Sequence, residues 1–232
     1  HIYPLISVAE RIQETVAPTG ADLDLRYFGS PGPFAQNLAE HDIRIVRIAS
    51  SKFRRYFDIM NIMDIFKFGW SVFQGLWKIF WFMPDAAFSK GGPGALAVSL
   101  VCRWYRIPLV MHESDAIPGI TNQITARHAR IVELAFPEAT PFFKGIRAAV
   151  QVVGCPVRKE IMSDESSRDA KVFLRFAPDI PLVFFVGGSQ GAELFNNFIL
   201  EHLPTLLQEF QVLHQTGRKL HESYAREYEF VA

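Results

Sequence analysis

The chain has 232 residues, of which 49% are hydrophobic and 21% charged, so it can bury the core of one large domain or two modest ones. Basic and acidic residues balance at 24 each, and a formal net charge of zero gives no support to nucleic-acid binding. The two cysteines, Cys102 and Cys155, lie far apart and do not form a disulfide framework, which favours a reducing compartment.

Strand-like and helix-like segments alternate along the chain. The first residues, beginning at His1, run directly into a helical pattern, without the strand and loop that usually precede such a helix, so we expect a fragment. Helices are expected over 4–16, 62–82, 95–105, 121–129, 192–210 and 218–230. Strands are expected over 23–28, 43–48, 86–89, 108–112, 131–135, 149–153, 182–186 and 211–214. This alternation predicts an α/β fold with parallel sheets.

The segment 62–83 is apolar enough to raise the question of a membrane span, but charged residues such as Asp64 interrupt it and argue against one. At about 100° per residue, the segment has two apolar faces. One of them is a predicted core stripe, formed by Ile65, Gly69, Val72, Leu76, Ile79 and Met83.

The other face of this segment carries Trp70, Trp77 and Trp81, with Lys67 and Lys78 on its flank. A tryptophan stripe edged by lysines suits a membrane interface. The cations and aromatics just upstream, at 52–57, would suit anionic lipid headgroups. The alternative is that both faces are buried between a sheet and neighbouring helices, because aromatic stripes usually belong to a core.

A glycine-rich turn follows the apolar strand pattern at 182–186 and leads into a helix. The turn contains Gly188, Ser189, Gln190 and Gly191, and its backbone can approach a ligand closely. Free N–H groups and the helix dipole at such a turn favour a phosphate or diphosphate. The spacing is neither that of a dinucleotide fingerprint nor that of a P-loop, so NAD and ATP are not the first candidates. A tight turn without a ligand is the alternative.

A second glycine turn begins at Lys90, after the strand pattern that ends at Ser89. The run from His112 to Asp115 lies at the C-terminal end of another strand, where α/β sheets place their ligands. Both runs are therefore candidate site segments. His112 and Glu113 could equally be a structural pair that braces the loop.

Seven segments in chain order resemble successive motifs of the MurG family. They are HIYPLISVAERI, SSKFRRYF, PDAAFSKGGPG, IPLVMHESDAIPGITN, VVGCPVRKEI, FVGGSQGAELFN and VLHQTG. The family comprises transferases that move N-acetylglucosamine from UDP-N-acetylglucosamine to undecaprenyl-diphospho-muramyl-pentapeptide (lipid I), which yields lipid II for peptidoglycan synthesis. The resemblance implies a fragment that lacks the first glycine-rich loop and most of the C-terminal domain. Such a fragment is expected to be inactive by itself.

The resemblance also implies a glycosyltransferase B fold, with two Rossmann-like domains across a cleft and the second one truncated. A polar segment at 163–178 places the boundary near Arg158, so we expect an acceptor-binding, membrane-associating domain at 1–158 and the start of a UDP-sugar domain at 159–232. By resemblance the reaction inverts the anomeric carbon, uses no cofactor or obligatory metal, and takes place at the cytoplasmic face of the plasma membrane. It would serve cell wall biogenesis, cell shape and division.

Donor-site assignments follow from this resemblance. Gly188 to Gly191 would supply N–H donors to the UDP diphosphate, and Arg158 could pair bidentately with its oxygens. A surface or interdomain salt bridge is the alternative for Arg158. Asp115 stands where some members carry an asparagine that contacts the donor sugar.

Acceptor-site assignments concern the two glycine loops of the first domain. His1 matches the histidine that ends the family's first loop and is a candidate base or acceptor-site residue, with a helix-capping role as the alternative. With Gly91 and Gly92 it forms the candidate site for the lipid I diphosphate. Expected partners are UDP-N-acetylglucosamine, lipid I and an anionic membrane surface. Alternatives are a lipid glycosyltransferase with another UDP-sugar or acceptor, and a non-catalytic membrane-bound remnant.

Overall fold

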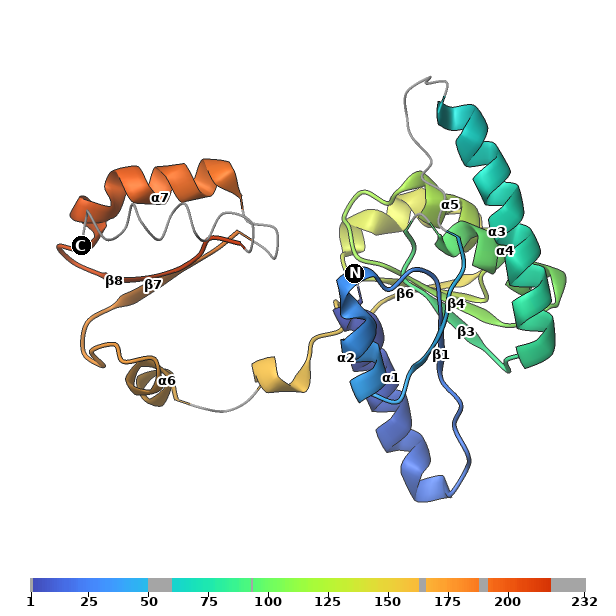
Figure 1. The fold of residues 1–232 in the computed structure, drawn as a ribbon, viewed down its shortest axis with the longest axis horizontal. Coiled ribbons are helices and arrows are strands. Elements are labelled where there is room, and N and C mark those ends of the chain that lie inside the picture. Colours follow the sequence, from blue (N-terminus) through green and yellow to red (C-terminus); the bar gives the residue numbers. More distant parts are fainter. Residues whose placement is uncertain (1, 50–59, 93, 163–165, 188–191, 218–232) are drawn as a thin grey trace. The chain divides into compact units, whose positions relative to one another are not determined.

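The computed structural model describes residues 2–49, 60–92, 94–162, 166–187 and 192–217 (Figure 1). The chain divides into two compact units, His1–Met162 and Ser163–Ala232. The boundary expected after Arg158 stays a prediction. Every described pair of neighbouring strands is parallel, and this confirms the expected α/β fold class.

The described part of the first unit contains two parallel sheets. One pairs β1 (Arg26–Phe28) with β2 (Arg44–Val46). The other has four strands in chain order, β3 (Ala87–Ser89), β4 (Leu109–Glu113), β5 (Ile131–Leu134) and β6 (Ala149–Val152). Parallel neighbours need crossover connections, and most of these contain helices.

The helices of this unit are α1 (Tyr3–Val16), α2 (Ala35–Glu40), α3 (Met60–Phe82), α4 (Ala95–Trp104) and α5 (Ile120–Ala126). Short 3₁₀ turns lie at Ala17–Thr19, Gly32–Phe34, Pro137–Phe143 and Lys159–Met162. Proline in the first turn of α1 fits the start of a helix, where no N–H partner is needed. Gly20 ends the turn after α1 with a left-handed φ of 71°.

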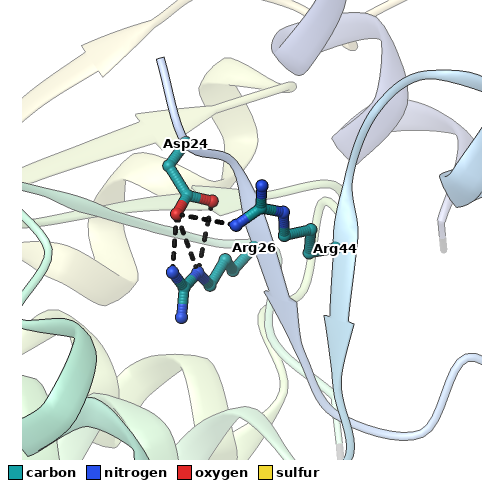
Figure 2. Close-up of polar contacts among 3 residues, drawn as sticks. All are labelled: Asp24, Arg26 and Arg44. Atoms are coloured by element: carbon teal, nitrogen blue, oxygen red, sulfur yellow. Dashed lines mark hydrogen bonds and ion pairs between the residues drawn. The ribbon is translucent and has the colours of Figure 1, made fainter. Parts of the chain in front are cut away.

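Arg26 and Arg44 face each other across the β1–β2 pair (Figure 2). Like charges in this position repel. Asp24 lies between the two guanidinium groups, accepting from Arg26 Nη2 at 2.6 Å and from Arg44 Nη1 at 3.5 Å. The hydrogen bonds from Arg26 lower the pKa of Asp24. Arg26 also lies over the ring of Phe82, 3.9 Å from its centroid, which links β1 to α3.

Two apolar clusters pack beside the four-stranded sheet. Met111, Val132 and Leu134 pack with Ala126 and Phe143. In a neighbouring cluster α3 packs against α4 through Ile79, Val101 and Cys102. A Cβ at Gly75 would lie 3.2 Å from Val101 Cγ2, so glycine allows a close approach of the two helices. Burial raises the pKa of Cys102 to about 11, which leaves its thiol unreactive.

The second unit contains a two-stranded parallel sheet of β7 (Leu182–Val186) and β8 (Gln211–Gln215). Helix α7 (Glu193–Leu206) covers one face of this sheet (Figure 1). Its buried residues Asn196, Ile199 and Leu203 recur at helical spacing and form the contact stripe. Helix α6 (Ser167–Phe173) is capped by Ser166, whose side chain accepts a hydrogen bond from the Asp169 amide.

Most expected elements are present within a few residues of their predicted ends. The prediction did not include α2 and α6, which are too short to show a clear helical period. The expected strand at 23–28 begins three residues late because only Arg26–Phe28 pairs with a neighbour. The expected helix at 218–230 and the cation-rich segment at 52–57 lie outside the described residues.

Candidate functional site

The second glycine turn lies between the C-terminal end of β3 and the start of α4. Gly91 and Gly92 have φ angles of 80° and 103°, a region that L side chains rarely adopt. The Gly91 amide donates to Ser89 Oγ at 3.2 Å. The turn delivers the chain to the N-terminus of a ten-residue helix, whose free N–H groups favour an anion. The expected strand, turn and helix are therefore all present here.

Asn122 on α5 packs against this turn. Its Nδ2 donates to Glu113 Oε2 at 2.9 Å, and both side chains are buried. Among the described residues its Oδ1 has no hydrogen-bond partner, and it faces Gly91, where a Cβ would lie only 1.9 Å from that oxygen. Glu113 Oε1 accepts from the Asp115 amide at 3.0 Å. Glu113 therefore ties the loop after β4 to the helix that supports the glycine turn.

A chain of polar contacts runs from Lys90 into the sheet. Lys90 Nζ donates to Ser114 Oγ, and Ser114 Oγ lies 3.3 Å from His112 Nδ1. His112 is fully buried, and its Nε2 lies 2.9 Å from the backbone oxygen of Gly154. These residues come from the C-terminal ends of β3, β4 and β6, so the ends of three strands meet at one polar cluster.

The other predicted residues of the first unit lie at the exposed surface. Asp115 is exposed, and its backbone amide is held by Glu113. Arg158 is exposed as well, and its guanidinium carbon lies 4.6 Å from the centroid of the Tyr3 ring. This contact brings the residues after β6 to the start of α1. A donor-binding role for Asp115 and Arg158 stays a prediction.

The predicted residues His1, Gly188, Ser189, Gln190 and Gly191 lie outside the described residues. The elements on either side of the second unit's glycine turn are described. Strand β7 ends at Val186 and α7 begins at Glu193, as the strand-turn-helix prediction requires.

Three tryptophans predicted as a surface stripe are exposed on α3. Trp70, Trp77 and Trp81 have exposed fractions of 56%, 62% and 70%. Burial of both apolar faces, the alternative reading, is therefore not observed for these residues. Three phenylalanines join them on the same side of the helix. We call this set the aromatic face: Phe66, Trp70, Phe73, Trp77, Phe80 and Trp81.

The predicted core stripe of α3 is only partly correct. Ile79 is buried, but Ile65 and Met83 are exposed. The face that meets the rest of the unit contains Ser71, Gly75 and Ile79, at a spacing of four residues. Ser71 Oγ donates to the backbone oxygen of Ala49 at 2.7 Å, which fixes the helix to the chain after β2. The aromatic face lies on the opposite side.

The two lysines that were expected to flank the tryptophans differ in their contacts. Lys67 is exposed, with its Nζ 3.9 Å from Asp64 Oδ1. Lys78 Nζ donates to the backbone oxygen of Arg47. None of the described helices, α3 included, has the length and apolarity that are needed to cross a bilayer.

Sequence analysis assigned no role to several residues of α3 and of the glycine-turn cluster. The phenylalanines of the aromatic face recur every seven residues, and the same helical projection that identified the tryptophans would have found them. Asn122 and Ser114 lie in the quoted motif IPLVMHESDAIPGITN, but their contacts with the glycine turn depend on strand neighbours. Lys90 begins the glycine turn, and its charge was the available signal.

Comparison with known proteins identifies the family. Residues 1–133 match the glycosyltransferase family 28 N-terminal domain, which is more than half of the chain, and residues 182–232 match the family 28 C-terminal domain. The chain belongs to glycosyltransferase family 28. Within family 28 it is a homologue of the MurG proteins, and the resemblance found in the seven motifs is confirmed.

Two curated relatives illustrate the match. The UDP-N-acetylglucosamine--N-acetylmuramyl-(pentapeptide) pyrophosphoryl-undecaprenol N-acetylglucosamine transferase 2 of Bacillus anthracis is 33% identical over 94% of this chain and 60% of its own length. The corresponding transferase of Clostridium botulinum strain Langeland is 29% identical over 94% of this chain and 59% of its own length. The chain thus spans about three-fifths of the length of the curated relatives that it matches.

Solved structures support the fold. MurG of Acinetobacter baumannii superposes with a TM-score of 0.67 at 24% identity, over 98% of this chain and 60% of that one. A UDP-GlcNAc 2-epimerase from Neisseria meningitidis, bound to UDP-GlcNAc, has a TM-score of 0.63 at 12% identity, over 100% of this chain and 68% of that one. At these identities the likeness establishes the parallel-sheet architecture shared by both proteins.

Proposed function

We propose that the protein transfers N-acetylglucosamine from UDP-N-acetylglucosamine to lipid I, with inversion at the anomeric carbon, and so forms lipid II. The observation that carries this proposal is the 33% identity, over 94% of the chain, to a relative named for this transfer. The two glycine turns support it, because a diphosphate occurs in both the donor and the acceptor and each turn leads into a helix N-terminus.

The two substrates would bind to different parts of the chain. We assign the acceptor to residues 1–158, with Gly91, Gly92 and His1 near its diphosphate. We assign the nucleotide sugar mainly to residues 159–232, with the turn at 188–191 around the UDP diphosphate. Arg158 would stabilise the negative charge that develops on departing UDP, and Asp115 would accept hydrogen bonds from sugar hydroxyls. His1 is the candidate base for the acceptor hydroxyl.

The acceptor is lipid-linked, so its reacting hydroxyl lies close to a bilayer. The aromatic face of α3 supports peripheral attachment of the protein at the cytoplasmic face of the plasma membrane. Six exposed aromatic side chains on one side of a helix form a contiguous apolar surface, and indole rings favour the membrane-water interface. The exposed Lys67 near this face would add attraction to anionic lipids.

The test of this function is a transfer assay with the product of the complete gene. Purified protein, radiolabelled UDP-N-acetylglucosamine and lipid I are expected to yield labelled lipid II in the extractable lipid fraction. UDP-glucose and UDP-galactose serve as donor controls and are expected to label the lipid poorly. Labelling from another UDP-sugar, or none from any donor, would overturn the proposed reaction.

A further inference from the structure

Lys90 places a positive charge at the entrance of the glycine turn. Its ammonium group has three N–H donors, and Ser114 Oγ accepts one of them. Among the described residues, no carboxylate lies within ion-pair distance of Lys90 Nζ. The side chain is only partly buried. The ammonium therefore has donors left for an anion that reaches the turn from solvent.

The hydrogen bonds that connect Gly154, His112, Ser114 and Lys90 allow one consistent assignment of donors and acceptors. The backbone oxygen of Gly154 can only accept, so Nε2 of His112 carries a proton and donates to it. In the neutral imidazole Nδ1 is then an acceptor, and the Ser114 hydroxyl donates to it. The Ser114 oxygen is left to accept from Lys90. The buried histidine thus orients a hydroxyl whose lone pair faces the ammonium.

A second support acts on the turn itself. Glu113 lies between His112 and Ser114 in sequence, and it holds Asn122 against Gly91. Successive residues of a strand point to opposite sides, so one short run can serve both tasks. His112 and Ser114 support the lysine, and Glu113 supports the glycine turn. Together these two sets of contacts fix the position of the Lys90 ammonium relative to the backbone of the glycine turn.

We propose that Lys90 binds the diphosphate of the lipid-linked acceptor, and that His112 and Ser114 are positioning residues that hold its ammonium at the glycine turn. The inference rests on the proposed function for the identity of the acceptor. The ligand chemistry, a diphosphate, is shared by donor and acceptor. The experiment must therefore separate the two substrates.

Steady-state kinetics on the product of the complete gene makes this separation. Lys90→Met is expected to raise the KM for lipid I by about 10- to 100-fold, the loss of one charge-assisted hydrogen bond, with the KM for UDP-N-acetylglucosamine unchanged. Lys90→Arg should restore most of the affinity. Lys144→Met removes an exposed lysine after the 3₁₀ turn Pro137–Phe143 and controls for net charge. A changed donor KM, or an unchanged acceptor KM, would overturn the assignment.

Binding of inorganic pyrophosphate gives a readout that does not depend on the proposed reaction. With UDP present in excess to occupy the donor turn, calorimetric titration should show Kd about tenfold weaker for Lys90→Met than for the parent and for Lys144→Met. This result would stand even if the parent protein transferred no sugar. Equal binding by all three proteins would refute the role of Lys90.

The positioning role has its own tests. Ser114→Ala should raise the acceptor KM by about 3- to 10-fold with kcat unchanged, and Ser114→Thr should retain parent values because the hydroxyl is kept. Nitrogen-15 NMR of His112 should report the tautomer protonated at Nε2, in the parent and in Lys90→Met. The tautomer protonated at Nδ1, or equal kinetics for the two serine variants, would contradict the proposed chain of hydrogen bonds.

Discussion

His214 Nε2 donates a hydrogen bond to Asn196 Oδ1 over 2.9 Å and joins β8 to the first turns of α7. The Asn196 amide is fixed in orientation because its Nδ2 donates to the backbone oxygen of Thr216 at 3.0 Å. Asn196 is fully buried, so both polar atoms of its amide depend on these partners. The bonds hold α7 in place directly after the glycine turn that we assign to the donor.

Truncation of Asn196 is expected to destabilise the second unit. Asn196→Ala removes both bonds and leaves the Thr216 oxygen and the His214 donor without their buried partner. We expect a loss of about 2–3 kcal/mol in the free energy of unfolding, measured by urea denaturation. Thr205→Ala, at an exposed position of the same helix, is the control and should cost less than about 0.5 kcal/mol. Similar losses for both variants would contradict a structural role for the asparagine.

The same pair predicts a dependence of stability on pH. Burial lowers the pKa of His214 below its usual value of 6.5, so the unfolded chain takes up this proton more readily than the folded chain. The contribution to stability is complete above pH 6.5 and is lost as the pH falls through the window between 6.5 and the lower folded-state pKa.

His214→Gln isolates this effect, because glutamine can donate to Asn196 but does not titrate. Thermal unfolding should be followed between about pH 7.5 and 5 for both proteins. The parent is expected to lose more Tm on acidification than the variant. Contributions from the rest of the chain are common to both proteins and cancel in the difference. Parallel Tm curves would exclude a contribution from His214.

Sequence periodicity located the elements around the site better than the contacts between them. The strand, glycine turn and helix at both glycine turns follow from local patterns of apolar and turn residues. The Asn196–His214 bond joins residues 18 positions apart, and no local pattern specifies it. The helical period of the α3 sequence identified two apolar faces, but it did not show how much of the helix length is covered by the rest of the unit. Helix α4 has 10 residues against 23 in α3, so it leaves Ile65 uncovered.

Substitution of Gly91 is expected to disrupt the glycine turn. Gly91→Ala combines a left-handed φ of 80° with a Cβ that would lie 1.9 Å from Asn122 Oδ1. We expect a loss of about 3 kcal/mol or more in the free energy of unfolding of the first unit, measured by denaturant titration. Gly20→Ala is the matched control, because Gly20 has a φ of 71° and no atom of the described residues lies within 4 Å of its Cβ position. That variant should cost only about 1–2 kcal/mol. Equal losses would show that Asn122 moves away without cost.

Removal of the Arg158 guanidinium is expected to weaken use of the donor. Arg158→Ala should lower kcat/KM for UDP-N-acetylglucosamine by about 10- to 100-fold, which corresponds to the roughly 1.5–3 kcal/mol of a charge-assisted hydrogen bond. Tyr3→Leu keeps the cation but removes the ring beneath it, and it should change kcat/KM by no more than about fivefold. An unchanged kcat/KM in Arg158→Ala would refute the donor-binding role, and Arg158 would then make only its surface contact with Tyr3.

The aromatic face of α3 predicts binding to an anionic membrane. Trp77 and Trp81 are among its most exposed residues, and their rings meet edge to face with centroids 5.8 Å apart. The double variant Trp77→Ser and Trp81→Ser removes two large apolar groups from the surface. We expect about tenfold weaker co-sedimentation with phosphatidylglycerol vesicles, with circular dichroism and UDP binding nearly unchanged.

Ile79 provides the matched control on the same helix, because its side chain is only 1% exposed and packs toward α4. Ile79→Ala should cost about 2–4 kcal/mol in the free energy of unfolding while vesicle binding by the folded protein is retained. The two variants therefore separate the roles of the two faces of α3. If the tryptophan variant unfolds, the aromatic face belongs to a core. If it stays folded and co-sediments fully, another surface of the protein binds the membrane.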